Sequence, residues 1–179
     1  MPFESSSVTV RRVDDRRWAV VEELVYRGRR DRFVVPAGFL TDFATVPRVV
    51  VWLIPRFGRY TLAAILHDWL VTEGLRSGVV TSREADGLFR RVMRESGVPV
   101  LRRWLMWCGV RWGALTSRLR RSGWVYSAPG VLGISLLAAP VVAPPAVLIA
   151  LALAVYGVAE WLVSVVARTR PDDAGSFQT

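Results

Sequence analysis

Four polar side chains in this sequence have the types and surroundings that could support chemistry. His67 is the only histidine, and Asp68 follows it within an apolar run, AAILHDWL. Asp42 lies in the segment FLTDFATVPR, and Asp86 lies at the apolar edge of the segment READGLF. One imidazole with several carboxylates suits Mn²⁺, Mg²⁺ or Fe²⁺ better than zinc. A divalent metal ion held by these four groups would activate water for attack on a phosphoester or a related bond.

The same four residues also have structural explanations. Asp42 can pin an irregular loop by accepting backbone N–H bonds, and His67 can be a hydrogen-bonded core imidazole. Asp68 can pair with Arg48, whose planar guanidinium suits a buried carboxylate. Asp86 lies three residues after one arginine and four before another, which are ordinary pairings along a helix. Both interpretations stay open, and the structural one is favoured.

Three common kinds of catalytic site do not fit the sequence. An HD phosphohydrolase needs further histidines, and the chain has only His67. No G-x-S-x-G element is present to expose a nucleophilic serine, and a P-loop is excluded because the chain has no lysine. Cys108 is the single cysteine, so an internal disulfide and a thiolate metal cluster are both excluded.

The elements that must position these groups begin with strands. Three segments between residues 8 and 36, VTVRRV, RRWAVVEELVY and RFVV, are short and rich in β-branched and aromatic residues. The segment RGRRD between the last two predicts a hairpin turn. Pro36 and Gly38 then mark a bend, and Pro47 holds the preceding residue away from helical geometry.

Two helices are predicted to carry His67, Asp68 and Asp86. RYTLAAILHDWLVTEG has apolar residues on nearly every side, which indicates a largely buried helix. TSREADGLFRRVMRESG begins with the spacing of a capping box, Thr81 to Glu84. Its predicted inner face consists of Ala85, Leu88, Phe89 and Val92.

A third helix is predicted from apolar residues at alternating steps of four and three. These residues are Leu101, Leu105, Cys108, Trp112, Leu115 and Leu119. Five residues are predicted to project from the other side and to lie at a membrane interface: Arg103, Trp107, Arg111, Arg118 and Arg121. A tryptophan among arginines is typical of the headgroup region of a bilayer. The alternative is a solvated, charged helix face.

The charge of the chain is concentrated beside this helix. All 24 basic residues are arginines, and the formal net charge is +9. Nine arginines against one acid, Glu95, lie between Gly87 and Tyr126, which indicates an anionic partner. Because this block directly precedes an apolar tail, a membrane surface is favoured over nucleic acid, for which no known binding module is recognisable.

The apolar tail, residues 120–170, is predicted to form a transmembrane helical hairpin. Residues 124–143 and 146–167 are each long enough to cross a hydrocarbon core of about 30 Å. Two adjacent prolines between them would reverse the chain, and arginines at both outer ends favour cytoplasmic ends. A single pass by the second segment, with the first lying shallow, and a helical pair packed on a soluble domain are the alternatives. Residues 171–179 are predicted to be a flexible tail.

Three ordered motifs resemble those of one known family. PAGFLTDFATVPR, RYTLAAILHDWLV and READGLFRRVMRESGV, followed by a tryptophan-rich helix ending in GVRWGAL, resemble the phage- and prophage-associated proteins catalogued as domain of unknown function 1353. The likeness covers about residues 15–116. Thr45 stands where the family usually has serine, which keeps the hydroxyl group.

The resemblance implies a phage or prophage origin and no known reaction. It brings forward Asp42, His67, Asp68 and Asp86 as signature positions. The first motif carries a structural signature: Pro36, Gly38, Phe39, Thr41, Pro47 and Arg48. The apolar tail lies outside the likeness.

We therefore expect an α+β domain over residues 1–119, with a small N-terminal antiparallel sheet and three helices, followed by the membrane hairpin. The expected role is that of a phage accessory protein on the cytoplasmic face of the host bacterial inner membrane. Its cleft would bind a ligand, a metal ion or another phage protein. The alternatives are a metal-dependent hydrolase that uses the four polar groups, and a protein of phage lysis or virion assembly.

Overall fold

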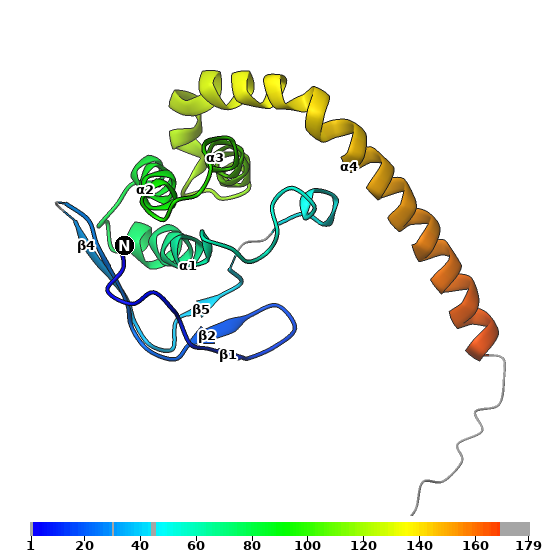
Figure 1. The fold of residues 1–179 in the computed structure, drawn as a ribbon, viewed down its shortest axis with the longest axis horizontal. Helices are drawn as coiled ribbons and strands as arrows, with labels where there is room; N and C mark the ends of the chain where they lie inside the picture. Colours follow the sequence, from blue (N-terminus) through cyan, green and yellow to red (C-terminus); the bar gives the residue numbers. More distant parts are fainter. Residues whose placement is uncertain (1, 30, 44–45, 169–179) are drawn as a thin grey trace, which may run out of the picture.

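The strands of this protein form two small antiparallel sheets, as a computed structural model of the chain shows (Figure 1). The structure describes residues 2–29, 31–43 and 46–168, so Thr45 and the predicted tail at 171–179 lie outside the described residues. One sheet has the order β1-β2-β5, with β1 (Val10–Arg12), β2 (Trp18–Val20) and β5 (Leu40–Thr41). The other is a hairpin of β3 (Leu24–Arg27) and β4 (Arg32–Val35), which confirms the predicted turn between them.

Three helices follow the strands, as predicted. They are α1 (Thr61–Trp69), which continues into the π-helix η2 (Leu70–Gly74), then α2 (Ser82–Glu95) and α3 (Val100–Ala114). The capping box of α2 is confirmed, because the backbone N–H of Glu84 donates to Thr81 Oγ1 at 3.3 Å and the Thr81 N–H donates to the Glu84 carboxylate at 2.8 Å. The inner face predicted for α2 is buried throughout: Ala85, Leu88, Phe89 and Val92.

The core is built around α1. Ile65 and Leu66 of α1 are buried together with Tyr26 of β3, Val35 of β4 and Val92 of α2. Figure 1 shows α1 between the strands and the α2–α3 pair, with the first part of the next helix crossing over α3. This arrangement explains why α1 is apolar on nearly every side, because it has protein neighbours all around it.

The apolar face predicted for α3 is right for Cys108, which is buried, and wrong for Leu101, Trp112 and Leu115, which are exposed. Its buried residues are Met106, Cys108, Arg111 and Ala114, whereas Leu101 is 79% exposed. The helix ends at Ala114, so Leu115 and Leu119 lie beyond it. Because α3 packs against α2 on one side and against the following helix on another, its buried residues lie on two faces and not on the single row of apolar residues that the sequence predicted.

A single helix, α4 (Trp124–Arg168), replaces the predicted hairpin. The chain does not reverse at Pro144–Pro145, because these two residues and two further prolines are accommodated inside 45 continuous helical residues. A proline within a helix removes one hydrogen bond and bends the helix without having to end it. Figure 1 shows α4 curving as it leaves the domain.

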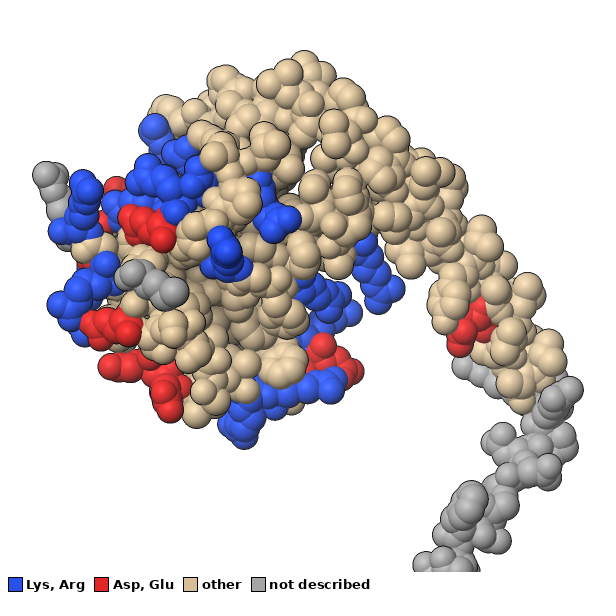
Figure 2. All heavy atoms as spheres, in the orientation of Figure 1, with Lys and Arg blue, Asp and Glu red and all other residues tan. Residues whose placement is uncertain are grey.

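The two halves of α4 have different surroundings. The first half packs on α3, where Val131 is fully buried, whereas every residue from 150 to 163 is exposed. Among the residues that the structure describes, one helical stretch, Arg121–Ala167, is long and apolar enough to cross a membrane. Figure 2 shows charged side chains gathered over the domain and an almost uncharged α4.

Candidate functional site

A buried carboxylate, Asp86, is the centre of an ionic cluster that joins all three helices of the domain. Its Oδ1 lies 2.7 Å from Nε2 of His67 and 2.8 Å from Nη2 of Arg120, and its Oδ2 lies 2.7 Å from Nη1 of Arg111. The Asp86 side chain is completely buried, and those of His67 and Arg111 are nearly so. Each carboxylate oxygen therefore accepts hydrogen bonds from basic groups, as a buried charge requires.

Each member of this cluster comes from a different element. His67 is on α1, Asp86 on α2, Arg111 on α3, and Arg120 on the turn between α3 and α4. The guanidinium of Arg111 extends the network, donating from Nη1 to the Ser82 hydroxyl at 3.3 Å and from Nε to the hydroxyl of Ser127, at the start of α4, at 2.8 Å. The cluster thus fixes the start of α4 against the domain.

The protonation states within the cluster follow from burial and charge. Burial lowers the pKa of His67, although the neighbouring Asp86 partly opposes this shift. Burial alone would raise the pKa of Asp86, but the hydrogen bond from His67 and the positive charges of Arg120 and Arg111 outweigh it and lower the pKa. We conclude that Asp86 is ionised and His67 neutral, so Nε2 of His67 donates to Asp86 and Nδ1 carries the lone pair.

A second polar group forms around Asp68, one residue after His67. The hydroxyl of Thr41 donates to Asp68 Oδ2 at 2.5 Å and accepts the backbone N–H of Phe43 at 2.9 Å. Burial raises the pKa of Asp68 well above its usual range; the Thr41 hydrogen bond opposes this, while the charge and hydrogen bonding of Asp42 add to it. Asp42 and Asp68 are therefore two neighbouring carboxyl groups, and Asp68 retains its proton to a higher pH than an ordinary aspartate.

The backbone on both sides of this second group departs from regular geometry. Phe43, which follows Asp42, is a buried non-glycine residue with φ of 65°, a conformation that requires support from its surroundings. Its ring packs against Trp18 and Phe57. Immediately after Trp69 the helix widens into the π-helix η2, a local feature that is frequent near functional sites.

The ionic cluster and the neighbouring carboxyl groups of Asp42 and Asp68 both contribute side chains to the lining of one cavity of about 630 Å³. Its polar lining consists chiefly of Asp42, His67, Asp68 and Arg120. Most of the remaining lining is apolar and comes from the 46–54 loop, α1, α3 and the first half of α4. Asp86 does not line this cavity but lies behind His67. The size and the mixture of apolar walls with a few polar groups are those of a small-molecule site.

The structure separates the four predicted metal ligands. Asp42, His67 and Asp68 line one cavity, but both oxygens of Asp86 are engaged by basic side chains. In the described part of the chain, no three His, Cys, Asp or Glu side chains are grouped to hold a metal ion. The geometry therefore gives no support to a shared metal site.

The predicted partners of the aspartates are also corrected. Asp68 accepts its hydrogen bond from Thr41, whereas Arg48 is exposed. Asp86 pairs with Arg111 and Arg120, 25 and 34 positions away, and not with the arginines of its own helix. The Asp86 carboxylate lies on the inner edge of α2, where arginines from α3 and from the turn after it can reach it. Arginines of α2 itself make other contacts: the guanidinium carbon of Arg90, for example, lies 4.0 Å from the centre of the Trp104 ring.

The predicted membrane-interface set is likewise divided. Arg111 is 1% exposed and belongs to the ionic cluster, so its placement at an interface is wrong. Arg118 and Arg121 are exposed, whereas Arg103 and Trp107 are half-buried. Sequence reasoning missed Arg111 and Arg120 as partners of Asp86; the available signal was the three-residue spacing from Cys108 to Arg111, which puts both on one helix face.

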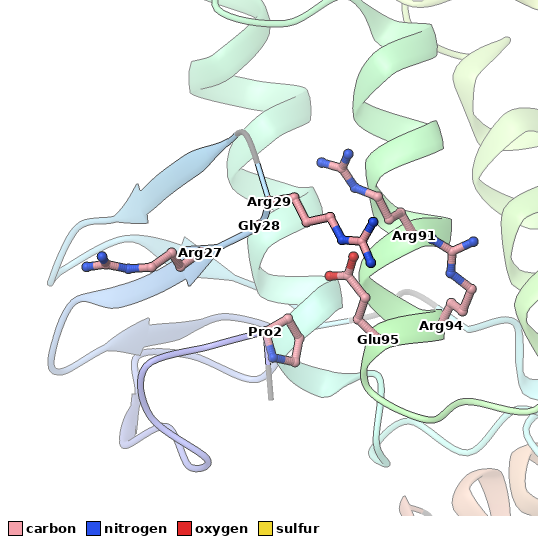
Figure 3. A pocket seen from close by; sticks show the side chains of 7 residues that line it. All are labelled: Pro2, Arg27, Gly28, Arg29, Arg91, Arg94 and Glu95. Carbon is pink, nitrogen blue, oxygen red and sulfur yellow. The ribbon is translucent and has the colours of Figure 1, made fainter.

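A second, arginine-rich pocket lies between the β3–β4 hairpin and the C-terminal part of α2 (Figure 3). Its volume is about 820 Å³, and its lining includes Arg27, Arg29, Arg91, Arg94 and Glu95. Much of its charge is already compensated, because Arg27 and Arg91 form ion pairs with nearby acids and Glu95 lies among the arginines. The cavity lined by Asp42, His67 and Asp68 is therefore the stronger candidate for a ligand site.

Comparison with known proteins defines the family of this chain. The model of a family described as "Protein of unknown function (DUF1353)" matches residues 18–110, more than half of the chain. The match includes Asp42, His67, Asp68 and Asp86 and ends before Arg111, Arg120 and α4. No curated protein and no solved structure matches the chain. Because this match covers more than half of the chain and includes the three motifs that carry Asp42, His67, Asp68 and Asp86, the chain belongs to the DUF1353 family.

Proposed function

We propose that this protein is anchored in a membrane by α4 and binds a small ligand in the cavity beside Asp42, His67 and Asp68. One observation carries the proposal: the helix that forms a wall of the cavity continues directly into an exposed apolar helix of membrane-spanning length. Ala138, Ala139, Val142 and Ala143 of α4 line the cavity, and the exposed stretch follows without a break.

The distal half of α4 supports a single membrane pass. Residues 146–167 number 22, which at 1.5 Å per residue is about 33 Å, enough for a hydrocarbon core of about 30 Å. A hairpin would require the first half to leave α3, with loss of the buried position of Val131 and of the Arg111–Ser127 hydrogen bond. The exposed arginines before α4 favour a cytoplasmic domain. On the resemblance to phage and prophage proteins, the membrane is a bacterial inner membrane.

Acid–base catalysis is a second candidate function. His67 is neutral and is held by Asp86, while Asp68 has a raised pKa and neighbours Asp42. A neutral imidazole and a carboxyl group with a raised pKa in one cavity are suited to accepting and donating a proton during hydrolysis. This chemistry uses the residues in their observed places and needs no metal ligand set. A role in lysis or virion assembly stays a prediction.

Fractionation and native mass spectrometry of the full-length protein test the main proposal. After cell breakage, the protein should sediment with membranes and be released by detergent but not by alkaline carbonate. Detergent-extracted protein should carry a bound small molecule that is lost in Gly109→Leu, because Gly109 lines the cavity and has open space in front of it. Gly133→Leu, a matched change on α4 away from the cavity, should retain the molecule. Protein in the supernatant overturns the anchor, and absence of any bound molecule overturns the ligand site.

A further inference from the structure

We propose that the ligand of this cavity is a neutral single-chain lipid with a hydroxyl-bearing head, taken directly from the bilayer in which α4 is anchored. This inference rests on the proposed function and specifies its ligand. Monoacylglycerol is the type of molecule that it describes.

The apolar lining of the cavity matches an acyl chain. Leu53 and Ile54 of the loop, Leu105 and Met106 of α3, and Val142 of α4 are among the lining residues. Burial of apolar surface against such walls stabilises a bound chain by about 25 cal/mol per Å². A polar metabolite would gain little from them.

The cavity is continuous with the membrane-spanning part of α4. Val142 and Ala143 line it, and the stretch long enough to cross the bilayer begins three residues later, at residue 146. At 1.5 Å of rise per residue this separation is about 4.5 Å along the helix axis. A lipid that moves along α4 would therefore reach the cavity without crossing water.

An apolar loop forms the other wall and presents aromatic residues outward. The loop contains η1 (Arg48–Val50), which packs against α4. Trp52 of this loop is 46% exposed, and Phe57, three residues after the loop, is 57% exposed. Figure 1 shows this loop, in cyan, between the domain and α4. Tryptophan concentrates at membrane–water interfaces, so the loop provides an interfacial surface beside the cavity.

The polar end of the cavity favours an uncharged head. The carboxyl groups of Asp42 and Asp68 line it. A phosphate beside them would add a negative charge that disfavours the ionisation of either carboxyl group, whereas an uncharged head would not. The arginine that faces the cavity, Arg120, already donates to the ionised Asp86. Hydroxyl groups, which both donate and accept hydrogen bonds, match a neighbouring pair of carboxyl groups and an imidazole, the groups that Asp42, Asp68 and His67 bring to the lining.

Photo-crosslinking in bilayers tests this inference. Full-length protein in phosphatidylcholine vesicles is incubated with a monoacylglycerol that carries a diazirine on its acyl chain, and labelled peptides are mapped by mass spectrometry. Labelling is expected on the 46–54 loop and on peptides that contain residues 105–113 or 138–143. Unlabelled monoacylglycerol should compete at least tenfold better than the phosphate-bearing lysophosphatidic acid of the same chain length.

Two pairs of variants separate the cavity from the rest of the bilayer surface. Gly109→Leu and Ala139→Trp fill the cavity and should reduce labelling about tenfold, while Gly133→Leu and Ala150→Trp should leave it unchanged. A variant counts as folded when its thermal unfolding midpoint equals that of the wild type. One folded variant that fills the cavity is enough to decide the test. Unchanged labelling in a folded filling variant, or equal competition by lysophosphatidic acid, overturns the inference. If the protein fails to float with the vesicles, the anchor proposal fails; if it floats but is not labelled at the cavity, only the lipid assignment fails.

Discussion

Nη1 of Arg111 lies 2.7 Å from Oδ2 of Asp86, and neither side chain is more than 1% exposed. Together with Arg120 and neutral His67, this pair makes an ionic cluster in the interior of a small domain. The desolvation of two opposite charges offsets much of their attraction, so such a cluster contributes less to net stability than its geometry suggests. Removal of one partner is strongly destabilising, because the remaining charge stays buried without an opposite charge beside it.

Substitution of Asp86 should show this asymmetry. Asp86→Asn keeps the size of the side chain but leaves the buried guanidinium of Arg111 and the partly buried one of Arg120 without a counter-charge, so the free energy of unfolding should fall by about 3–5 kcal/mol. Asp31→Asn, which removes the partner of Arg91 in a more exposed ion pair, should lower it by no more than about 1 kcal/mol. Denaturant unfolding of detergent-solubilised protein measures both, and equal losses would contradict the buried-cluster assignment.

Arg111 and Arg118 provide a second matched pair. Arg111→Gln removes a buried charge with three hydrogen-bonding partners and should lower the thermal unfolding midpoint by several degrees. Arg118→Gln changes an exposed residue just after α3 and should leave the midpoint within error. The comparison uses thermal scans at one protein and detergent concentration. Identical midpoints for the two variants would contradict the buried position of Arg111 and favour the membrane-interface position predicted from the sequence.

The lowered pKa of His67 predicts loss of stability on acidification. The imidazole of the unfolded chain binds a proton near its ordinary pKa of 6.5, whereas the folded chain resists protonation, so stability is full above this pH and declines as the pH falls below it. His67→Gln should remove this part of the pH dependence. Denaturation midpoints at intervals between pH 7.5 and pH 5 measure the slope, and a wild-type slope retained in the variant would falsify the prediction.

The raised pKa of Asp68 predicts the opposite slope. The folded chain holds this proton above the ordinary aspartate pKa of 3.8, so the unfavourable contribution to stability is absent below that pH and grows as the pH rises toward the folded-state pKa. Asp68→Asn, which cannot ionise, should flatten the decline and be more stable than the wild type at neutral pH. The same denaturation series checks this, with Asp15→Asn, a change at an exposed aspartate, as the control. A variant less stable than the wild type at pH 7.5 would oppose the assignment.

Arginine substitutions within α4 should distinguish one membrane pass from two. Val155→Arg places a charge near the centre of residues 146–167, at an expected cost of about 2.5–3.5 kcal/mol for insertion, and should shift protein out of the membrane pellet. Leu137→Arg lies on the exposed side of the first half of α4, which packs along the domain, and should leave the pellet unchanged. Equal loss from both variants would favour the hairpin.

Local patterns in the sequence were sufficient for much of the fold. The capping box of α2 and its inner face at Ala85 and Val92 were predictable because both depend on residues within one helix. The hairpin turn was predictable because its charged segment lies between two β-branched strands. His67 and Asp68 also stood out, since polar residues inside an apolar run require partners.

Only the tertiary structure decided which partners those residues have. Asp86 pairs with Arg111 and Arg120, which are 25 and 34 positions away. The spacing from Cys108 to Arg111 could indicate that Arg111 faces inward, but it does not indicate which carboxylate Arg111 pairs with. The buried side of α3 depends on α2 and α4 together, so a period read from one helix gave the wrong face. The composition of the tail determined that α4 is apolar along its length; packing of its first half on α3 decided that this half lies along the domain, because buried contacts and hydrogen bonds hold it there.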